Sequence, residues 1–259
     1  MARSNCITRR PSIGFAIAAL AALAMLASGC ETNRNANAFL SADRTVRVVN
    51  HDPKLRSQQL ERLAGQAARE YTALRRAFGK DVGRITVEVR DRGVGRHFPP
   101  ATIHIPSRLI RKSRAITAHE ITHLLAQGWT SLVLKEGLAV YAQARFGEQR
   151  GWPNYGRPIH RSARRWRNTP NVGVRTPADA EFVWATARRR DTEARRAAYA
   201  IAGSWVTWIV EEKLGGDLGR FMERLYRTGD YPAALGQPQA ALAREWGEFV
   251  EAAGSKSRK

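Results

Sequence analysis

The chain of 259 residues is predicted to adopt an α+β fold, and three observations lead to this class. A helical pattern of apolar residues occupies residues 53–78, two short alternating segments follow at 85–89 and 101–105, and the last third is again helical. Strands confined to one part of a chain, with helices in the remainder, are typical of this class. We expect a small N-terminal sheet with a helix, then a mostly helical C-terminal half.

The N-terminus has the layout of an export signal. Arg3, Arg9 and Arg10 precede an apolar run at residues 13–27, which is short for a membrane span. Small residues before Cys30 resemble a bacterial lipoprotein cleavage site. We therefore expect a signal peptide over residues 1–29, a lipid anchor on Cys30 and a location in the bacterial cell envelope, on the periplasmic side. The alternative is an ordinary secretory signal and a secreted protein.

Composition limits the possible partners and ligands. The two cysteines, Cys6 and Cys30, leave no disulfide and no cysteine metal ligand in a mature chain that begins at Cys30. The net charge of +20 favours membrane surfaces and anionic envelope polymers as partners. No nucleic-acid-binding motif is present, so we expect no nucleic acid partner. We expect a monomer.

One domain is expected after the signal. Residues 30–52 begin with a polar, asparagine-rich stretch and are assigned to a tether or linker. Residues 53–254 suffice for a single domain with an apolar core, and residues 255–259 are assigned to a disordered basic tail.

The N-terminal half of this domain should contain one long helix and two strands. The helix at 53–78 ends before Gly79, a suitable C-cap, and its apolar stripe is Leu60, Leu63, Ala64, Ala67, Tyr71, Leu74 and Phe78. Residues 85–89 and 101–105 alternate as strands do, and residues 91–100 between them are predicted to form a loop.

The most informative stretch is His119-Glu120-Ile121-Thr122-His123. On a helix, His119 and His123 leave the same face, so that both imidazoles can reach one Zn²⁺ at about 2.0–2.1 Å. Glu120 lies beside them, where a carboxylate can accept a proton from an activated water. Apolar neighbours on both sides support a helix that ends near Gly128.

A third ligand is expected from the next apolar stretch, residues 132–146. Its first half contains one acid, Glu136, which a turn at 127–130 and a helix from Ser131 would bring back to the histidines. A catalytic zinc site has three protein ligands and one open position, and two histidines with a glutamate form one such set.

The two segments together resemble the peptidase MA-like, gluzincin-type zinc metalloproteases. The residues that carry the resemblance are His119-Glu120-x-x-His123 and Glu136-Gly137-Leu138-Ala139-x-Tyr141, with weaker similarity in the C-terminal helices. It implies a zincin-like domain with an active-site helix, Zn²⁺ bound by His119, His123 and Glu136, and hydrolysis of a peptide or protein substrate. It also implies that the strand before the zinc helix borders the cleft and offers a free edge to the substrate.

Two further residues follow from this resemblance. Some members use a tyrosine on a later helix as a second electrophile, and Tyr199 is the candidate here; Tyr141 would point away from the metal. Thermolysin-like members carry an aspartate where this chain has Val140, so the partner that orients the zinc histidine must come from elsewhere.

The rest of the chain is less specific. Residues 147–191 are basic and aromatic and fit either a substrate-binding lid or a solvated loop. Residues 199–214, 218–226 and 239–252 are predicted helices, the first of them central.

Two alternatives to peptide hydrolysis remain open. One is a non-enzymatic, envelope-anchored basic binding module. The other is an amidase that acts on cell-wall material with the same site.

Overall fold

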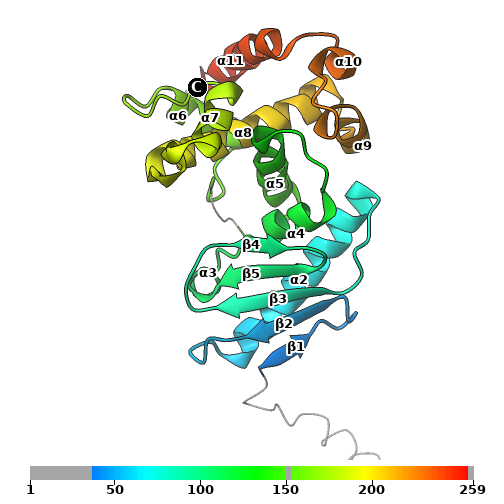
Figure 1. Ribbon diagram of the computed structural model, residues 1–259. Helices are drawn as coiled ribbons and strands as arrows, with labels where there is room; N and C mark the ends of the chain where they lie inside the picture. The colour runs from blue at the N-terminus through cyan, green and yellow to red at the C-terminus, as the bar shows by residue number, and fades with distance from the viewer. Residues whose placement is uncertain (1–36, 150–152, 256–259) are drawn as a thin grey trace, which may run out of the picture. The chain divides into compact units, whose positions relative to one another are not determined.

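A five-stranded mixed sheet forms the N-terminal part of the structure, a computed structural model that describes residues 37–149 and 153–255 (Figure 1). The spatial order is β1-β2-β3-β5-β4, with the inner strands parallel and both outer strands antiparallel to their neighbours. The strands are β1 (Ala38–Leu40), β2 (Val46–Asn50), β3 (Ile85–Arg90), β4 (Arg96–Phe98) and β5 (Thr102–Pro106). The two strands expected from the sequence are β3 and β5.

Two segments that were predicted to be a linker and a loop contain strands of this sheet. Residues 30–52 were assigned to a tether, but residues 38–50 supply β1 and β2, and Val46 and Val48 are fully buried. Residues 91–100 were assigned to a loop, but they contain β4. This short strand pairs with β5, so the edge that was expected to be free at residues 101–105 is covered, and β4 is the outer strand instead.

Helix α2 (Ser57–Phe78) packs on the sheet through the predicted stripe, of which Leu60, Leu63 and Leu74 are buried. The helix begins later than expected and ends as expected: Gly79 adopts a left-handed conformation (φ 61°) that only glycine adopts without strain, and its N–H donates to the Arg75 carbonyl. The alternating buried residues of β3 and β5 complete this apolar layer.

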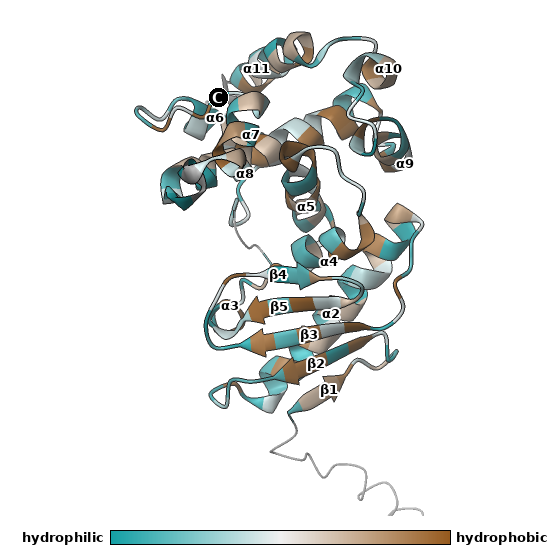
Figure 2. Ribbon diagram, viewed as in Figure 1, coloured by the Kyte–Doolittle hydropathy of each residue, from teal (hydrophilic) through white to brown (hydrophobic). Residues whose placement is uncertain are grey.

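The C-terminal half is helical, as predicted, and α8 (Thr192–Trp208) is its centre, packed against α5, α6 and α7. Figure 2 shows hydrophobic and hydrophilic residues on both α5 and α8. Trp205 of α8 and Trp246 of α11 are fully buried with their rings in edge contact. The other elements are α3 (Ser107–Arg111), α4 (Thr117–Leu125), α5 (Leu132–Phe146), α6 (Ile159–Arg167), α7 (Pro177–Ala185), η2 (Ala187–Arg190), η3 (Ile209–Lys213), α9 (Leu218–Phe221), η4 (Met222–Tyr226), α10 (Tyr231–Leu235) and α11 (Gln239–Ser255).

The mixed sheet and the helical half agree with the α+β class. The expected signal peptide (1–29) and Cys30 lie outside the described residues, as does the tail beyond Ser255, which itself belongs to α11. Among residues 37–149 and 153–255, no helix is both long enough and apolar enough to cross a membrane.

Candidate metal centre

Helices α4 and α5 bring the three predicted ligands together. The Nε2 atoms of His119 and His123 lie 3.3 Å apart, and Glu136 Oε2 lies 3.5 Å from the first and 3.4 Å from the second. A tetrahedral ion with bonds of 2.0–2.1 Å needs ligand atoms about 3.3–3.4 Å apart. The three donor atoms therefore already have the spacing of one face of such a tetrahedron.

The electrostatics of this triad suit a cation. The side chains of both histidines are buried and that of Glu136 is only 12% exposed. Burial lowers the pKa of His123, which favours the neutral imidazole that binds metals. Burial opposes ionisation of Glu136, but the imidazoles of His123 and His119 outweigh it and hold the pKa of this carboxyl well below its ordinary value. The site thus offers a buried carboxylate beside imidazole nitrogens.

Buried polar side chains from other elements fix helix α4, which carries His119 and His123. At its first turn, the Thr117 hydroxyl donates to Glu70 of α2, and the His119 N–H donates to Gln143 Oε1 of α5 at 3.0 Å. At its last turn, the Tyr226 hydroxyl donates to the Ala126 carbonyl at 2.7 Å. The bonds to the His119 N–H and to the Ala126 carbonyl satisfy backbone groups that a helix leaves unpaired at its ends, and all three bonds hold the position of the two histidines.

Helix α5 is fixed in the same way. The Ser131 hydroxyl caps its N-terminus by accepting from the Leu134 N–H, and the Glu181 carboxylate of α7 accepts from the N–H groups of Leu132 and Val133. The sequence predicted the turn and a helix from Ser131; the helix begins one residue later, with Ser131 as its cap. The role of Glu181 was not predicted, because its contact with α5 is made by a distant segment.

Two glycines allow α5 and α8 to cross closely. A Cβ on Gly137 would lie 2.4 Å from the Ala202 carbonyl oxygen, and a Cβ on Gly203 would lie 2.3 Å from Val140 Cγ1. Gly137 directly follows Glu136, the predicted third ligand. The close crossing therefore sets the distance between Glu136 and the residues of α8.

Tyr199 of α8 lies at the site, as predicted. Its ring centroid is 6.0 Å from that of His119, and it lines the same cavity as the three ligands. Burial raises the pKa of Tyr199 well above its ordinary value, and the Glu136 and Glu120 carboxylates raise it further, so the hydroxyl stays protonated and can donate. Tyr141 points away from the metal ligands, also as expected, and donates to Glu211 at 2.9 Å.

The predicted base Glu120 is buried on α4, directly beneath the edge strand. His97 Nδ1 of β4 lies 3.9 Å from Glu120 Oε2, and the His97 ring centroid is 4.5 Å from that of His123. A Cβ on Gly95 would lie only 2.3 Å from Glu120 Oε1. The backbone before β4 therefore limits where this carboxylate can point.

This contact gives a testable expectation for Gly95→Ala. The added methyl group clashes with the end of a flexible side chain, so we expect the Glu120 carboxylate to move and the fold to remain. Because misplacing a catalytic group by about 1 Å can cost roughly a hundredfold in rate, any hydrolytic kcat should fall by about that factor. Zinc content and the unfolding midpoint should stay within error of wild type. Unchanged kcat would mean that Gly95 does not position Glu120.

His97 is the residue that the sequence analysis missed. It forms a second potential metal-binding group with Glu120 and His123, which shares His123 with the first. The only signal in the sequence was that histidine is scarce, with six in the chain. His104, also a strand histidine, instead binds Glu88 at 2.8 Å and belongs to neither group.

For His119, the described residues provide no substitute for an orienting aspartate. His119 Nδ1 is buried and has no hydrogen-bond partner within residues 37–149 and 153–255. Val140, at the position of the family's aspartate, instead packs against Gly203. The orientation of His119 thus depends on packing and on its backbone bond to Gln143.

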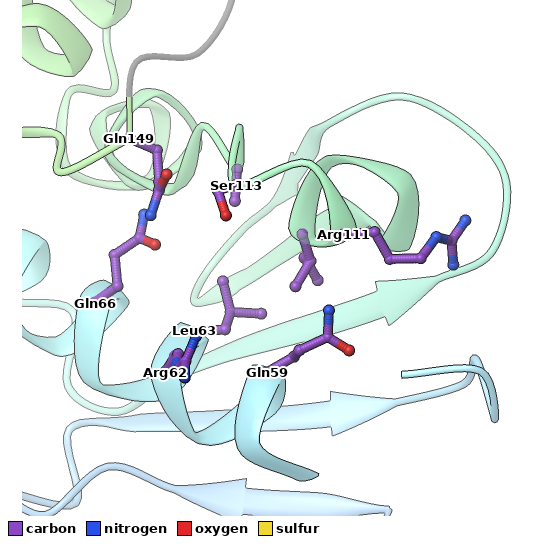
Figure 3. Close-up of a pocket in the computed structure, with 9 residues that line it drawn as sticks. Gln59, Arg62, Leu63, Gln66, Arg111, Ser113 and Gln149 are labelled. Atoms are coloured by element: carbon purple, nitrogen blue, oxygen red, sulfur yellow. The ribbon is translucent and has the colours of Figure 1, made fainter. Parts of the chain in front are cut away.

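Two cavities adjoin the candidate metal centre, and both are lined by His119, Glu120 and Tyr199. One of about 280 Å³ is lined by β4 residues and the ligands, and one of about 400 Å³ extends from Glu120 and Tyr199 towards α3 and the start of α8. Residues 147–191 contribute Tyr155 to the larger cavity, whereas Trp166 packs on the helical core. A separate cavity of about 290 Å³ between α2 and residues 110–115 contains none of the ligands (Figure 3).

Gln66 lines that separate cavity (Figure 3). It also donates a hydrogen bond to Glu70, the buried acid that accepts from Thr117 at the first turn of α4. Its Nε2 donates to Glu70 Oε1 and to Thr117 Oγ1, both at 2.9 Å, and the Glu148 N–H donates to the same carboxylate at 2.8 Å. Burial raises the pKa of Glu70 from 4.5 to about 7, although these hydrogen bonds lower it.

Glu70 should make stability depend on pH. Its pKa is raised in the folded state, so the folded protein binds more protons than the unfolded chain between pH 4.5 and about 7. The free energy of unfolding should therefore fall across this range, by on the order of 3 kcal/mol for this group. Urea unfolding in chelator should show that Glu70→Gln lacks this decline. Parallel curves for both proteins would contradict the assignment.

Comparison with models of protein families finds no match, and comparison with curated proteins finds none either. The resemblance to gluzincin-type metalloproteases therefore rests on the motif residues alone.

Proposed function

We propose that the protein is a zinc-dependent metallopeptidase. The observation that carries the proposal is the spacing of 3.3–3.5 Å between the donor atoms of His119, His123 and Glu136. The chemistry of the set agrees with zinc, which accepts imidazole and carboxylate ligands in tetrahedral geometry. Glu120 and Tyr199 line the same cavity and fit the roles of base and electrophile.

His119, His123 and Glu136 would hold the ion. When bound, Zn²⁺ supplies Lewis acidity, which lowers the pKa of a water molecule and polarises a carbonyl group. Glu120 then accepts the proton of the attacking water and delivers it to the leaving amine. Its burial beside His97 and Gly95 keeps the carboxylate fixed for this transfer.

The Tyr199 hydroxyl donates a hydrogen bond to the carbonyl oxygen as negative charge develops on it. The outer strand β4 offers its free edge to an extended peptide, which would pair with its backbone and lie across the ligands. The proposed fold is accordingly zincin-like, of the gluzincin type. The protein would act in the bacterial envelope, anchored through Cys30.

The test is zinc content by mass spectrometry on purified protein, together with cleavage of a mixed peptide pool. We expect one zinc per chain and cleavage that a chelator stops and added zinc restores. Zinc without cleavage of any peptide would contradict peptidase activity and favour a binding role or another amide substrate. A protein that binds no zinc would contradict the metal site.

A further inference from the structure

The larger cavity at the centre is strongly basic. It is lined by five cationic side chains, which come from α3, from the segment that follows it and from the first turns of α8: Arg108, Lys112, Arg114, Arg195 and Arg196. Among the described residues that line it, Glu120 is the only acidic one. In a chain of net charge +20 many surfaces are basic, so this concentration needs comparison with the other cavities.

That comparison separates this cavity from its neighbours. Each of the four other cavities described has one or two lysine or arginine side chains in its lining. The difference in the number of cations is largest between the two cavities at the metal centre. The smaller cavity has one cation in its lining, Arg96, although it shares four lining residues with the basic cavity: Gly95, His119, Glu120 and Tyr199. The positive charge is therefore concentrated on one side of the ligands.

The five cations have no close acidic partner among the described residues. Within the described part of the chain, none of them forms an ion pair with an acidic side chain. Their observed contacts are to neutral groups: Arg108 donates to the Gly93 carbonyl at 2.6 Å, and the guanidinium of Arg114 lies 5.1 Å from the Tyr155 ring centroid. These contacts orient the side chains and leave their charge available to a ligand.

We propose that this basic pocket binds a carboxylate group of the substrate, so that the enzyme selects peptides with an acidic group on one fixed side of the cleaved bond. The inference rests on the proposed function, since Glu120 and Tyr199 form the wall that the pocket shares with the metal centre. The carboxylate belongs either to an aspartate or glutamate side chain or to the C-terminus of a short peptide. Guanidinium groups recognise both by paired hydrogen bonds.

Binding can be measured without cleavage. The probes are octapeptides of alanine and glutamine that carry an uncharged fluorophore. One set is amidated at the C-terminus and has a single glutamate moved along the chain; one peptide has no glutamate but a free C-terminus; the neutral reference has no glutamate and is amidated. They are titrated by fluorescence anisotropy into zinc-loaded Glu120→Gln protein. We expect at least one charged probe to bind about tenfold more tightly than the neutral amidated peptide, with the advantage reduced by added salt.

Charge variants identify the pocket. In the same background, Arg114→Glu with Arg195→Glu should abolish the preference, and Arg114→Gln with Arg195→Gln should weaken it if the first pair impairs folding. A control of equal net charge, Arg47→Glu with Arg220→Glu, changes exposed residues of β2 and α9 outside the pocket and should retain it. The position of the favoured glutamate, or a preference for the free C-terminus, distinguishes the two sources of the carboxylate.

The outcomes separate the two proposals. Equal binding of charged and neutral probes, or a preference that persists in Arg114→Glu with Arg195→Glu, would overturn the carboxylate pocket. Selective binding without cleavage by wild-type protein would support the pocket and overturn the peptidase. Cleavage without any preference for acidic peptides would support the peptidase and overturn the carboxylate pocket.

Discussion

Glu120→Gln should lower the rate of peptide cleavage by at least about a hundredfold while the protein keeps one zinc per chain. Glutamine has nearly the same shape but cannot accept a proton, so the proton transfers to and from water are lost. General base catalysis contributes roughly a hundredfold to ten-thousandfold, and the expected fall in kcat lies in this range. The measurement is single-turnover cleavage of a peptide taken from the pool, with zinc determined on the same sample.

Glu212→Gln is the matched control, since Glu212 is an exposed acid in η3 that lines none of the cavities described. It should cleave at the wild-type rate. Wild-type activity in Glu120→Gln would remove Glu120 from the mechanism. Loss of zinc together with activity would show that this carboxylate supports the metal rather than the proton transfer.

Glu136→Gln should lose the metal. Two imidazoles remain, but the carboxylate that lies within 3.5 Å of both Nε2 atoms is gone, and with it the negative charge that favours a cation in this buried site. Changes in groups that merely orient ligands cost ten- to a hundredfold in metal affinity, so loss of a ligand should cost at least about a hundredfold. Competition with a chromophoric chelator measures the affinity, and cleavage should fall with zinc occupancy.

Glu88→Gln provides the control for this change. Glu88 also contacts a histidine, His104 at 2.8 Å, but this pair lies on β3 and β5 and belongs to neither potential metal group. Its zinc affinity should equal that of wild type. Wild-type zinc affinity in Glu136→Gln would rule out Glu136 as a ligand.

The ligand helices could be predicted because their information is local. The spacing of His119 and His123 fixes them on one face of a helix, and the turn before the Ser131 cap returns the chain so that Glu136 meets them. A long helix such as α2 can also be predicted, because its apolar residues recur with helical periodicity and Gly79 marks its end. These features depend on residues close in sequence, where propensity and pattern act directly.

The missed features depend on distant contacts. Strands β1 and β4 have three residues each, too few for a period to be recognised, and both are stabilised by pairing with a neighbouring strand. His97 reaches Glu120 only because β4 lies over α4. In the same way, Glu70 and Glu181 stabilise the ends of α4 and α5 from other elements. No local pattern in the sequence marks such partners.

The crossing of α5 and α8 also affects how mutational tolerance should be interpreted. A side chain at Gly137 meets a backbone carbonyl oxygen, which cannot turn aside as the end of a side chain can, and one at Gly203 meets the branched Val140. Positions 137 and 203 should therefore be as intolerant of substitution as the ligands, although neither glycine has a side chain that could bind metal or move a proton. In a saturation screen for function, intolerance alone would not separate residues that perform chemistry from residues that let two helices meet.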